Sequence, residues 1–226
     1  MKMIKSITII ILLSFAQLQA YEKLPDVLTV KNVVRNMQEA FLRIKTYKAN
    51  FKIKITQGKI KKEQRGVVKY KIPGQIIFLF SRPADQIIYS DGQILKIYLP
   101  DLKVVGEQKL ESKNKDLMFV NSKNSYYQLV KQYNFSIDPE TKNYKGQKIY
   151  ILHLTQKNVY SGFEIIDLWV SENWFILKAV GKTREGKTVA VSFSNIKIND
   201  VLTDHEFEFD LPVDVQTVVN PLYSDK

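Results

Sequence analysis

The sequence predicts an α+β protein that is mainly β, a strongly curved antiparallel sheet or barrel with helices packed against it. Three observations predict this fold class. The hydrophobic period changes from helical spacing to a spacing of two near residue 48. About ten segments with the period of two then follow, separated by turn residues. Only residues 112–134 break this rhythm, and we expect one or two short helices there, around 117–119 and 126–133.

The first element after the N-terminal segment is an amphipathic helix, predicted over residues 26–46. Its apolar residues follow the three-and-four spacing of one helical face, and most of its charged residues fall elsewhere. Thr29 is the expected N-cap. The apolar face consists of Val30, Val33, Val34, Met37, Phe41 and Ile44.

The strands follow in order. We expect them at 49–58, 65–74, 75–81, 86–100, 103–110, 147–156, 162–172, 174–183, 188–199 and 205–212. Asp91 and Gly92 separate two apolar runs and predict a short hairpin turn. Pro212 ends the last predicted strand, and residues 213–226 are expected to form an extended tail.

One predicted strand is apolar on both faces. Residues 76–80 are all apolar, whereas a strand with one face in water alternates polar and apolar residues. Both faces of this strand therefore need a cover.

The first twenty residues differ from the rest of the chain. Lys2 and Lys5 precede an apolar run over 7–15 and a polar stretch that ends at Ala20, which is the pattern of a secretory signal peptide. The apolar run is short for a membrane-spanning helix, so a retained anchor is the weaker alternative. We expect residues 1–20 to be cleaved after export, and residues 21–226 to form one domain.

Composition limits the chemistry of the protein. The chain has no cysteine, which excludes thiol catalysis and thiolate metal sites. The formal net charge is +11, and it falls to +9 when Lys2 and Lys5 are removed. Such a charge favours anionic partners, and export argues against nucleic acid among them. The positive charges are scattered, with one dense cluster at 59–65.

Catalytic motifs are absent from the sequence. Nucleophile elbows, glycine-rich phosphate loops and His/Asp metal clusters do not occur. The two histidines, His153 and His205, lie in predicted strands, and we expect His153 to be buried with its hydrogen bonds satisfied. The sequence therefore predicts neither an enzyme nor a bound cofactor.

One face of the predicted sheet is rich in large apolar side chains. Such a face needs an apolar cover, which is either a packed core or a ligand in an apolar cavity. The residues are Phe51, Ile53, Val68, Tyr70, Ile76, Phe78, Phe80, Ile88, Leu95 and Ile97.

The order of motifs resembles that of the LolA family of periplasmic outer-membrane lipoprotein carriers. The helix is followed by "RGVVKYKIPGQIIFLFSRP" at 65–83, then "IIYSDGQILKIYLPDLKVV" at 87–105, and "FEFDLPVDV" at 207–215. No single motif is specific, but their order and spacing extend over residues 30–220.

The resemblance implies a half-open barrel of about eleven antiparallel strands, with helices as a lid over an apolar cavity. It implies that the cavity holds lipoprotein acyl chains and that the carrier collects its cargo from an inner-membrane ABC transporter of the LolCDE type. Further implied partners are an outer-membrane receptor or the membrane surface, and we expect a monomer in the periplasm of a diderm bacterium. Carried over by position, the lining falls on Met37, Phe41, Ile44, Phe51, Ile76, Phe78, Phe80 and Ile88.

One position departs from the family pattern. The family has an arginine directly before the first proline, where it bonds to the lid, and this chain has Ile72. The resemblance therefore leaves open whether apolar contacts close the lid or the chain carries a related lipid cargo instead. Carriage of free lipid or glycolipid, and a lipoprotein-sensing role in envelope regulation, are the alternatives on the same fold.

Overall fold

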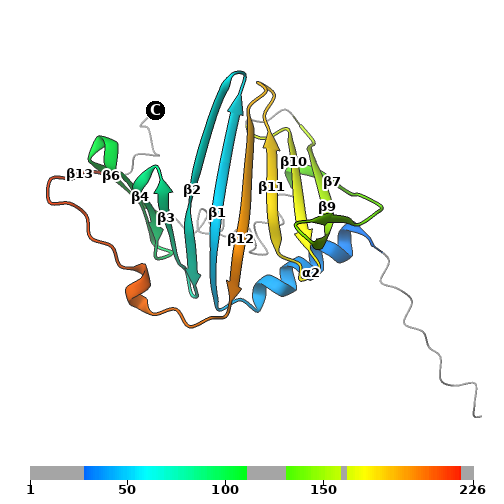
Figure 1. The fold of residues 1–226 in the computed structure, drawn as a ribbon, viewed down its shortest axis with the longest axis horizontal. Coiled ribbons are helices and arrows are strands. Elements are labelled where there is room, and N and C mark those ends of the chain that lie inside the picture. Colours follow the sequence, from blue (N-terminus) through cyan, green and yellow to red (C-terminus); the bar gives the residue numbers. More distant parts are fainter. Residues whose placement is uncertain (1–27, 111–130, 159–161, 220–226) are drawn as a thin grey trace, which may run out of the picture.

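The computed structural model describes residues 28–110, 131–158 and 162–219 of the chain. Figure 1 shows a large curved sheet with the helix α2 (Val30–Leu42) at its lower end. The predicted mainly β class is confirmed. The predicted signal peptide, the 117–119 helix and most of the 126–133 helix lie outside the described residues.

The described residues form one sheet of thirteen strands, more than the ten to eleven expected. They follow the order β13-β6-β5-β4-β3-β2-β1-β12-β11-β10-β9-β7, and β8 pairs with β9. Their bounds are β1 (Thr46–Gln57), β2 (Ile60–Lys71), β3 (Gln75–Arg82), β4 (Ala84–Ser90), β5 (Ile94–Leu99), β6 (Val104–Lys109), β7 (Tyr133–Ile137), β8 (Lys142–Tyr144), β9 (Gln147–Gln156), β10 (Ile165–Ser171), β11 (Ile176–Lys182), β12 (Thr188–Ile198) and β13 (Gln216–Val219).

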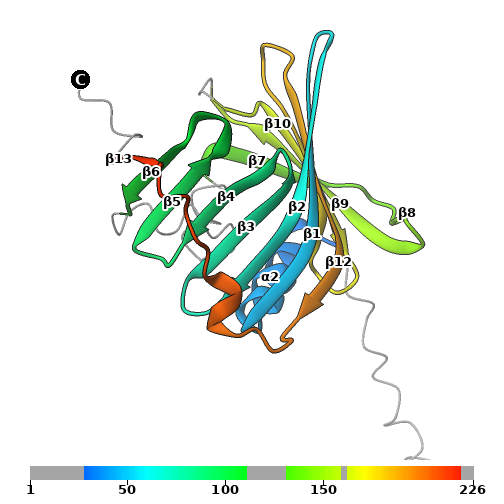
Figure 2. The ribbon, with the colours of Figure 1, turned by 60° about the vertical axis from the view of Figure 1, so that its left-hand side comes forward.

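The sheet curves without closing. Among the described strands, the two ends of the sheet are β13 and β7, and they do not pair with each other. Figure 2 shows the curvature from the side, with α2 in the hollow of the sheet. This arrangement agrees with the half-open barrel that the resemblance implies, and it leaves an inner and an outer face.

Helix α2 begins at Val30, later than the predicted start at residue 26, and directly after the predicted N-cap, Thr29. The hydroxyl of Thr29 accepts a hydrogen bond from the backbone N–H of Asn32 at 3.2 Å, which satisfies one of the free donors of the first turn. Val33 and Val34 are buried in a core with the inner-face side chains of β7, β9 and β10. The helix ends at Leu42, earlier than predicted, because the chain turns there into β1.

The turn between β4 and β5 is the predicted Asp91-Gly92 hairpin. Gly92 has a φ of +87°, a left-handed conformation that favours glycine. The carboxylate of Asp91 accepts hydrogen bonds from the backbone N–H groups of Gln93 and Ile94 at 2.7 and 2.8 Å. The side chain thus fixes the turn.

The second face of the apolar strand β3 is covered by the segment after β12. Ile77 is fully buried on the outer face of β3, where it contacts Leu202 and Phe207. Phe209 lies against Tyr89 of β4, with ring centroids 5.4 Å apart. The outer face of β3 therefore belongs to a packed core.

The predicted strand at 205–212 is wrong. Residues Asp204–Phe207 form a short 3-10 helix, η2, and no described strand lies between β12 and β13. The alternation in "HEFEFDLP" resembles a strand because Phe207 and Phe209 both pack toward the sheet, while Glu208 between them is exposed.

Three short strands were not predicted. Residues 133–137 form β7, so Tyr133 starts a strand and not the end of a helix. Residues 142–144 form β8. Residues 216–219 form β13, which pairs parallel with β6, so the predicted tail contributes to the sheet. These strands are only three to five residues long, too short for a clear period of two.

Candidate functional site

An apolar cavity of about 370 Å³ lies between α2 and the inner face of the sheet. This volume falls within the range of small-molecule sites in proteins, roughly 300–1,000 Å³. No charged side chain occurs among the described residues that line it. They are Met37, Phe41, Ile44, Tyr47, Val68, Tyr70, Ile76, Phe78, Leu168, Trp174, Phe175, Ile176, Ala179, Val191 and Phe193.

The two halves of α2 contact different parts of the sheet. Val33 and Val34 are anchored in the core beside β9 and β10, whereas Met37 and Phe41 reach the cavity. The ring of Phe41 stacks on Tyr70 of β2, with centroids 6.2 Å apart. The C-terminal half of the helix therefore forms one wall of the cavity through apolar contacts.

Aromatic side chains support the opposite wall. Phe51 packs edge-on against Phe78 and Phe80, with centroid distances of 5.5 and 4.9 Å. Burial raises the pKa of Tyr47 far above its ordinary value and raises that of Tyr70 as well. Both phenols are therefore neutral across the physiological pH range, and they place no charge in the cavity.

The strand register places all ten sheet residues of the predicted apolar face on the inner side of the sheet. Phe51, Val68 and Phe78, for example, lie on one face of adjacent strands. Seven of the thirteen predicted site residues line the cavity itself: Met37, Phe41, Ile44, Val68, Tyr70, Ile76 and Phe78.

The other six lie beside the cavity or beyond it. Phe51 and Phe80 are buried in a core cluster, with Ile53 and Ile88 packed against it. Leu95 is buried and Ile97 half-buried on β5, outside the cavity lining. A role for these six in lipid binding stays a prediction.

Eight lining residues were missed, and most come from the second half of the sheet. A signal for some of them was present: Val191 and Phe193 share parity on β12, and the register sets them opposite Ile53 and Phe51. Tyr47 shares the parity of Phe51 on β1. The other five lie on β10, on β11 or in the turn between them, and they depend on how these strands pair with β12, which the local pattern does not show. The eight missed residues are Tyr47, Leu168, Trp174, Phe175, Ile176, Ala179, Val191 and Phe193.

Ile72 lies outside the cavity. Its backbone N–H donates to the carbonyl oxygen of Lys45 at 3.0 Å, and its residue surface is 48% exposed. Nearby, the amide of Asn199 accepts from the N–H of Lys45 and donates to the carbonyl of Arg43, which ties the end of α2 to the end of β12. The side chain of Ile72 has no hydrogen-bonding group, so it offers no polar contact to α2.

His153 was expected to be buried, and this is wrong: its side chain is 36% exposed on the outer face of β9. It is satisfied, because Nδ1 bonds to Asp167 at 2.7 Å and Nε2 bonds to Asp138 at 2.8 Å. The hydrogen bonds to Asp167 and then Asp138 raise the pKa of His153. The other histidine, His205, lies in η2 and not in a strand.

Residues 28–110, 131–158 and 162–219 contain neither a cluster of metal ligands nor a membrane-spanning helix. No group of three or more His, Asp or Glu side chains there is placed to hold a metal ion. No helix of that part has the length and hydrophobicity needed to cross a bilayer.

Two relatives named outer-membrane lipoprotein carrier protein resemble this chain in sequence. The protein from Hahella chejuensis is 26% identical over 77% of this chain and 82% of its own length. The protein from Bordetella avium is 27% identical over 72% of this chain and 74% of its own length.

Solved structures with low sequence identity share the fold. An uncharacterized conserved protein from Thermus thermophilus has a TM-score of 0.58 at 11% identity, over 84% of this chain and 98% of its own. MucB has a TM-score of 0.53 at 13% identity, over 80% of this chain and 62% of its own. At such identities these likenesses concern the fold alone.

The profile of the family described as outer membrane lipoprotein carrier protein LolA matches residues 43–210. This match runs from just after α2 through β12 and the segment that covers the outer face of β3. The inner-face residues of β1 to β3 and β10 to β12 that line the cavity all fall within it. The chain therefore belongs to the LolA family.

Proposed function

We propose that the protein is a periplasmic carrier that binds the acyl chains of lipoproteins in the cavity beneath α2. The observation that carries this proposal is the cavity itself, which combines an uncharged lining with one wall formed by a single helix. Acyl chains are the biological ligands that such a lining suits, because they offer hydrocarbon and no hydrogen-bonding groups. Family membership and the names of the two relatives support the same assignment.

The energetics of acyl binding favour a wall that can move. Burial of a methylene group is worth about 0.8 kcal/mol, so a dozen would contribute about 10 kcal/mol before the costs of binding. That corresponds to an affinity between micromolar and nanomolar. A carrier must also release its cargo, and opening of α2 would expose the cavity and lower the affinity. Mobility of the helix therefore belongs to the proposal.

The proposed route runs from an inner-membrane ABC transporter to the outer membrane, after export and removal of residues 1–20. The carrier acts as a monomer, residues 21–226 form its single domain, and it performs no chemistry. The uncharged lining of the cavity supports a role without catalysis, because a catalytic site needs groups that transfer protons or attack a substrate.

Phe78→Glu tests the binding site. Phe78 is half-buried in the cavity wall, so a carboxylate there would be desolvated by an acyl chain, at a cost of several kcal/mol. We expect the affinity for a fluorescent acyl probe, dansylated undecanoic acid, to fall by at least about a hundredfold. Titration of the probe by fluorescence gives the dissociation constant.

Ile60→Glu is the matched control, because Ile60 is 60% exposed at the start of β2, outside the cavity lining. Circular dichroism should show that both variants fold. Unfolding of Phe78→Glu alone would identify Phe78 as part of a packed core, and unchanged affinity would place the acyl site elsewhere.

Two alternatives use the same cavity. A carrier of free lipid or glycolipid would copurify with that lipid, which mass spectrometry of an organic extract would identify. The second alternative is a lipoprotein-sensing regulator on the fold that this chain shares with MucB, of which it covers 62%. A regulator would bind acylated protein without delivering it to a membrane.

A further inference from the structure

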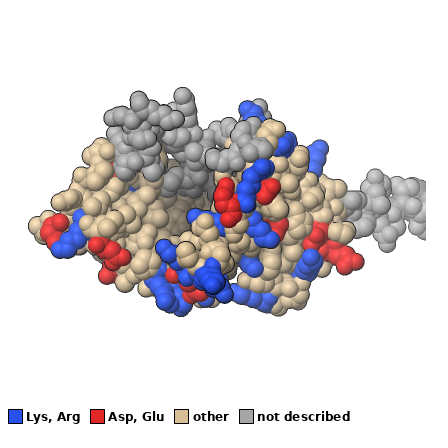
Figure 3. Space-filling model, turned by 90° about the horizontal axis from the view of Figure 1, so that it is seen from above, with Lys and Arg blue, Asp and Glu red and all other residues tan. Residues whose placement is uncertain are grey.

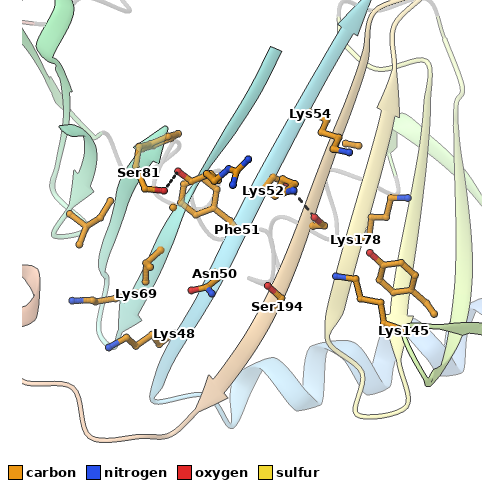
Figure 4. A pocket seen from close by; sticks show the side chains of 18 residues that line it. Lys48, Asn50, Phe51, Lys52, Lys54, Lys69, Ser81, Lys145, Lys178 and Ser194 are labelled. Carbon is orange, nitrogen blue, oxygen red and sulfur yellow. Dashed lines mark hydrogen bonds between the residues drawn. The ribbon is translucent and has the colours of Figure 1, made fainter. Parts of the chain in front are cut away.

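A second hollow surface lies on the outer face of the sheet, opposite the cavity. It has a volume of about 930 Å³ and is formed mainly by β1, β2, β3, β11 and β12, with the turn after β8 at one end. We call it the outer groove. The residues of its floor include Asn50, Ala190, Ser192 and Ser194, and the larger apolar side chains of Phe51, Val67, Leu79 and Phe80 line it as well. Figure 4 shows it with α2 behind the sheet.

The outer groove is strongly cationic. No carboxylate occurs among the described residues that line it, whereas seven cations do: Lys48, Lys52, Lys54, Arg65, Lys69, Lys145 and Lys178. Figure 3 shows Lys and Arg side chains gathered toward the lower edge of that view, with fewer Asp and Glu among them. The groove therefore concentrates positive charge that the sequence distributes over several strands.

Part of this charge is neutralised from the rim. Glu206 of η2 approaches the ammonium groups of Lys48 and Lys69 at 3.3 and 3.1 Å. Glu63 of β2 pairs with Lys52 and with Arg65.

Three lysines of the groove lack such a partner. Within residues 28–110, 131–158 and 162–219, no carboxylate lies within 4.0 Å of the ammonium group of Lys54, Lys145 or Lys178. These three amines gather at the end of the groove near β8 and β11 (Figure 4).

Aromatic rings hold two of these amines in place. The ammonium of Lys178 lies 3.8 Å from the centroid of the Trp169 ring, and that of Lys145 lies 5.3 Å from the Tyr144 ring. The two rings pack edge-on with centroids 4.8 Å apart. Burial and the charge of Lys54 lower the pKa of Lys178. A bound anion would offset the repulsion between these two ammonium groups.

We propose that the outer groove docks an extended acidic peptide segment of a partner protein. The cations of β1 lie along the strand at residues 48, 52 and 54, a span of about 20 Å at roughly 3.3 Å per residue. An extended segment with carboxylates on alternate residues has the same rise per residue and can meet several of these cations in turn.

Two other anionic partners fit the groove less well. A single phosphate group is held by donors that converge on one point, whereas the seven cations of the groove come from β1, β2, β11 and the turn after β8 and are spread along and across the strands. A membrane surface is flat, whereas these cations line a hollow, with the turn after β8 at one end. The groove thus goes beyond the proposed acyl cavity, because it lies on the other face of the sheet and can be occupied independently.

The test uses the full chain and a fluorescein-labelled peptide of about ten alternating Glu and Ser residues. Fluorescence anisotropy measures its binding at about 0.02 M and about 0.2 M salt, because screening weakens ionic contacts. We expect saturable binding that the double variant Lys54→Glu/Lys178→Glu weakens at least about tenfold.

The matched control is Lys31→Glu/Lys109→Glu, which makes the same change in net charge at exposed positions of α2 and β6, outside the groove. We expect this control to weaken binding by less than about twofold. Equal losses in the two double variants would overturn the proposal, because net charge and not the groove would then govern binding.

A second variant fills the groove without changing its charge. Ser194→Trp places a large ring on the floor, where it should block the peptide while leaving every lysine in position. Undiminished binding by a folded Ser194→Trp protein would contradict docking in the groove. Absence of peptide binding, with binding to phosphatidylglycerol vesicles that Lys54→Glu/Lys178→Glu abolishes, would identify a membrane-contact face and overturn the peptide proposal.

Discussion

Gly66 in β2 lies where the backbone of β3 and a ring of the inner core come too close for a side chain. A Cβ atom there would overlap the carbonyl oxygen of Leu79 and lie 2.9 Å from the ring of Phe51. The register between β2 and β3 shifts between Arg65 and Gly66. The glycine therefore supports the packing beside the cavity.

Gly66→Ala should destabilise the protein by about 3 kcal/mol, since the new methyl group meets a backbone carbonyl that cannot turn away. Chemical denaturation measures the free energy of unfolding. Gly58→Ala is the control: its Cβ meets no atom within 4 Å, and its left-handed φ of +56° accounts for a loss of about 1 kcal/mol. Equal losses in the two variants would show that β2 and β3 can move apart at Gly66.

His153 links three parts of the outer face through Asp138 and Asp167. Its pKa is raised in the folded state, so the folded protein holds this proton more tightly than the unfolded chain does. The resulting stabilisation is fully present below the unfolded pKa of about 6.5, and it is lost as the pH rises through the higher folded pKa. Asp138 adds the opposite dependence at acidic pH, because Lys142 and His153 lower its pKa.

We therefore expect the free energy of unfolding to decline as the pH rises from about 6 to about 9, and His153→Gln to remove much of that decline. Denaturation curves at a series of pH values measure both proteins. Parallel pH profiles for the wild-type protein and the variant would mean that the two carboxylate contacts do not hold the proton in solution.

At the scale of elements, the segment after β12 secures the outer face of the aromatic strand β3. Phe207 is only 3% exposed and covers Ile77, which has no exposed surface. This cover lets β3 remain apolar on both faces while only its inner side reaches the cavity.

Phe207→Ala should cost about 3–5 kcal/mol of folding free energy, which is usual for removing a buried phenylalanine. Val201→Ala is a control in the same segment, because Val201 is 91% exposed, and its effect should stay within about 0.5 kcal/mol. A small effect of Phe207→Ala in thermal denaturation would contradict the packed outer core.

Helix α2 has an anchored half and a half that faces the cavity, and this division predicts where it moves. Acyl binding should increase the hydrogen-exchange protection of the last turns, around Met37 and Phe41, more than that of the first turn, where Val33 and Val34 are already buried. Mass spectrometry of peptides from residues 30–44 with and without the acyl probe measures this. Equal protection in both states would exclude the helix as a moving wall.

At the scale of the whole molecule, much of the fold followed from local pattern. The helix, its Thr29 cap, the long strands and the Asp91-Gly92 turn are set by nearby residues, so the sequence predicted them. The strand predicted at 205–212 was wrong because the alternation of apolar residues there reflects burial against β3 and not strand pairing. The cavity wall from β10 to β12 was missed because its residues meet α2 only through long-range pairing.

The outer groove was missed for a similar reason. The sequence shows one dense basic cluster at 59–65, whereas the groove draws its cations from β1, β2, β11 and the turn after β8. Each of these lysines looks like an ordinary solvent-facing residue when its own segment is read alone. Only the order of the strands brings them together on one surface.

A release assay tests whether the protein carries acylated lipoproteins. Purified residues 21–226 are added to spheroplasts that bear newly made, labelled lipoproteins, and the soluble fraction is analysed for complexes by size. We expect release of lipoproteins in a soluble one-to-one complex, and loss of that release in Phe78→Glu. Lipoproteins that stay in the membrane, beside a folded protein that still binds the acyl probe, would contradict lipoprotein carriage and indicate transport of free lipid instead.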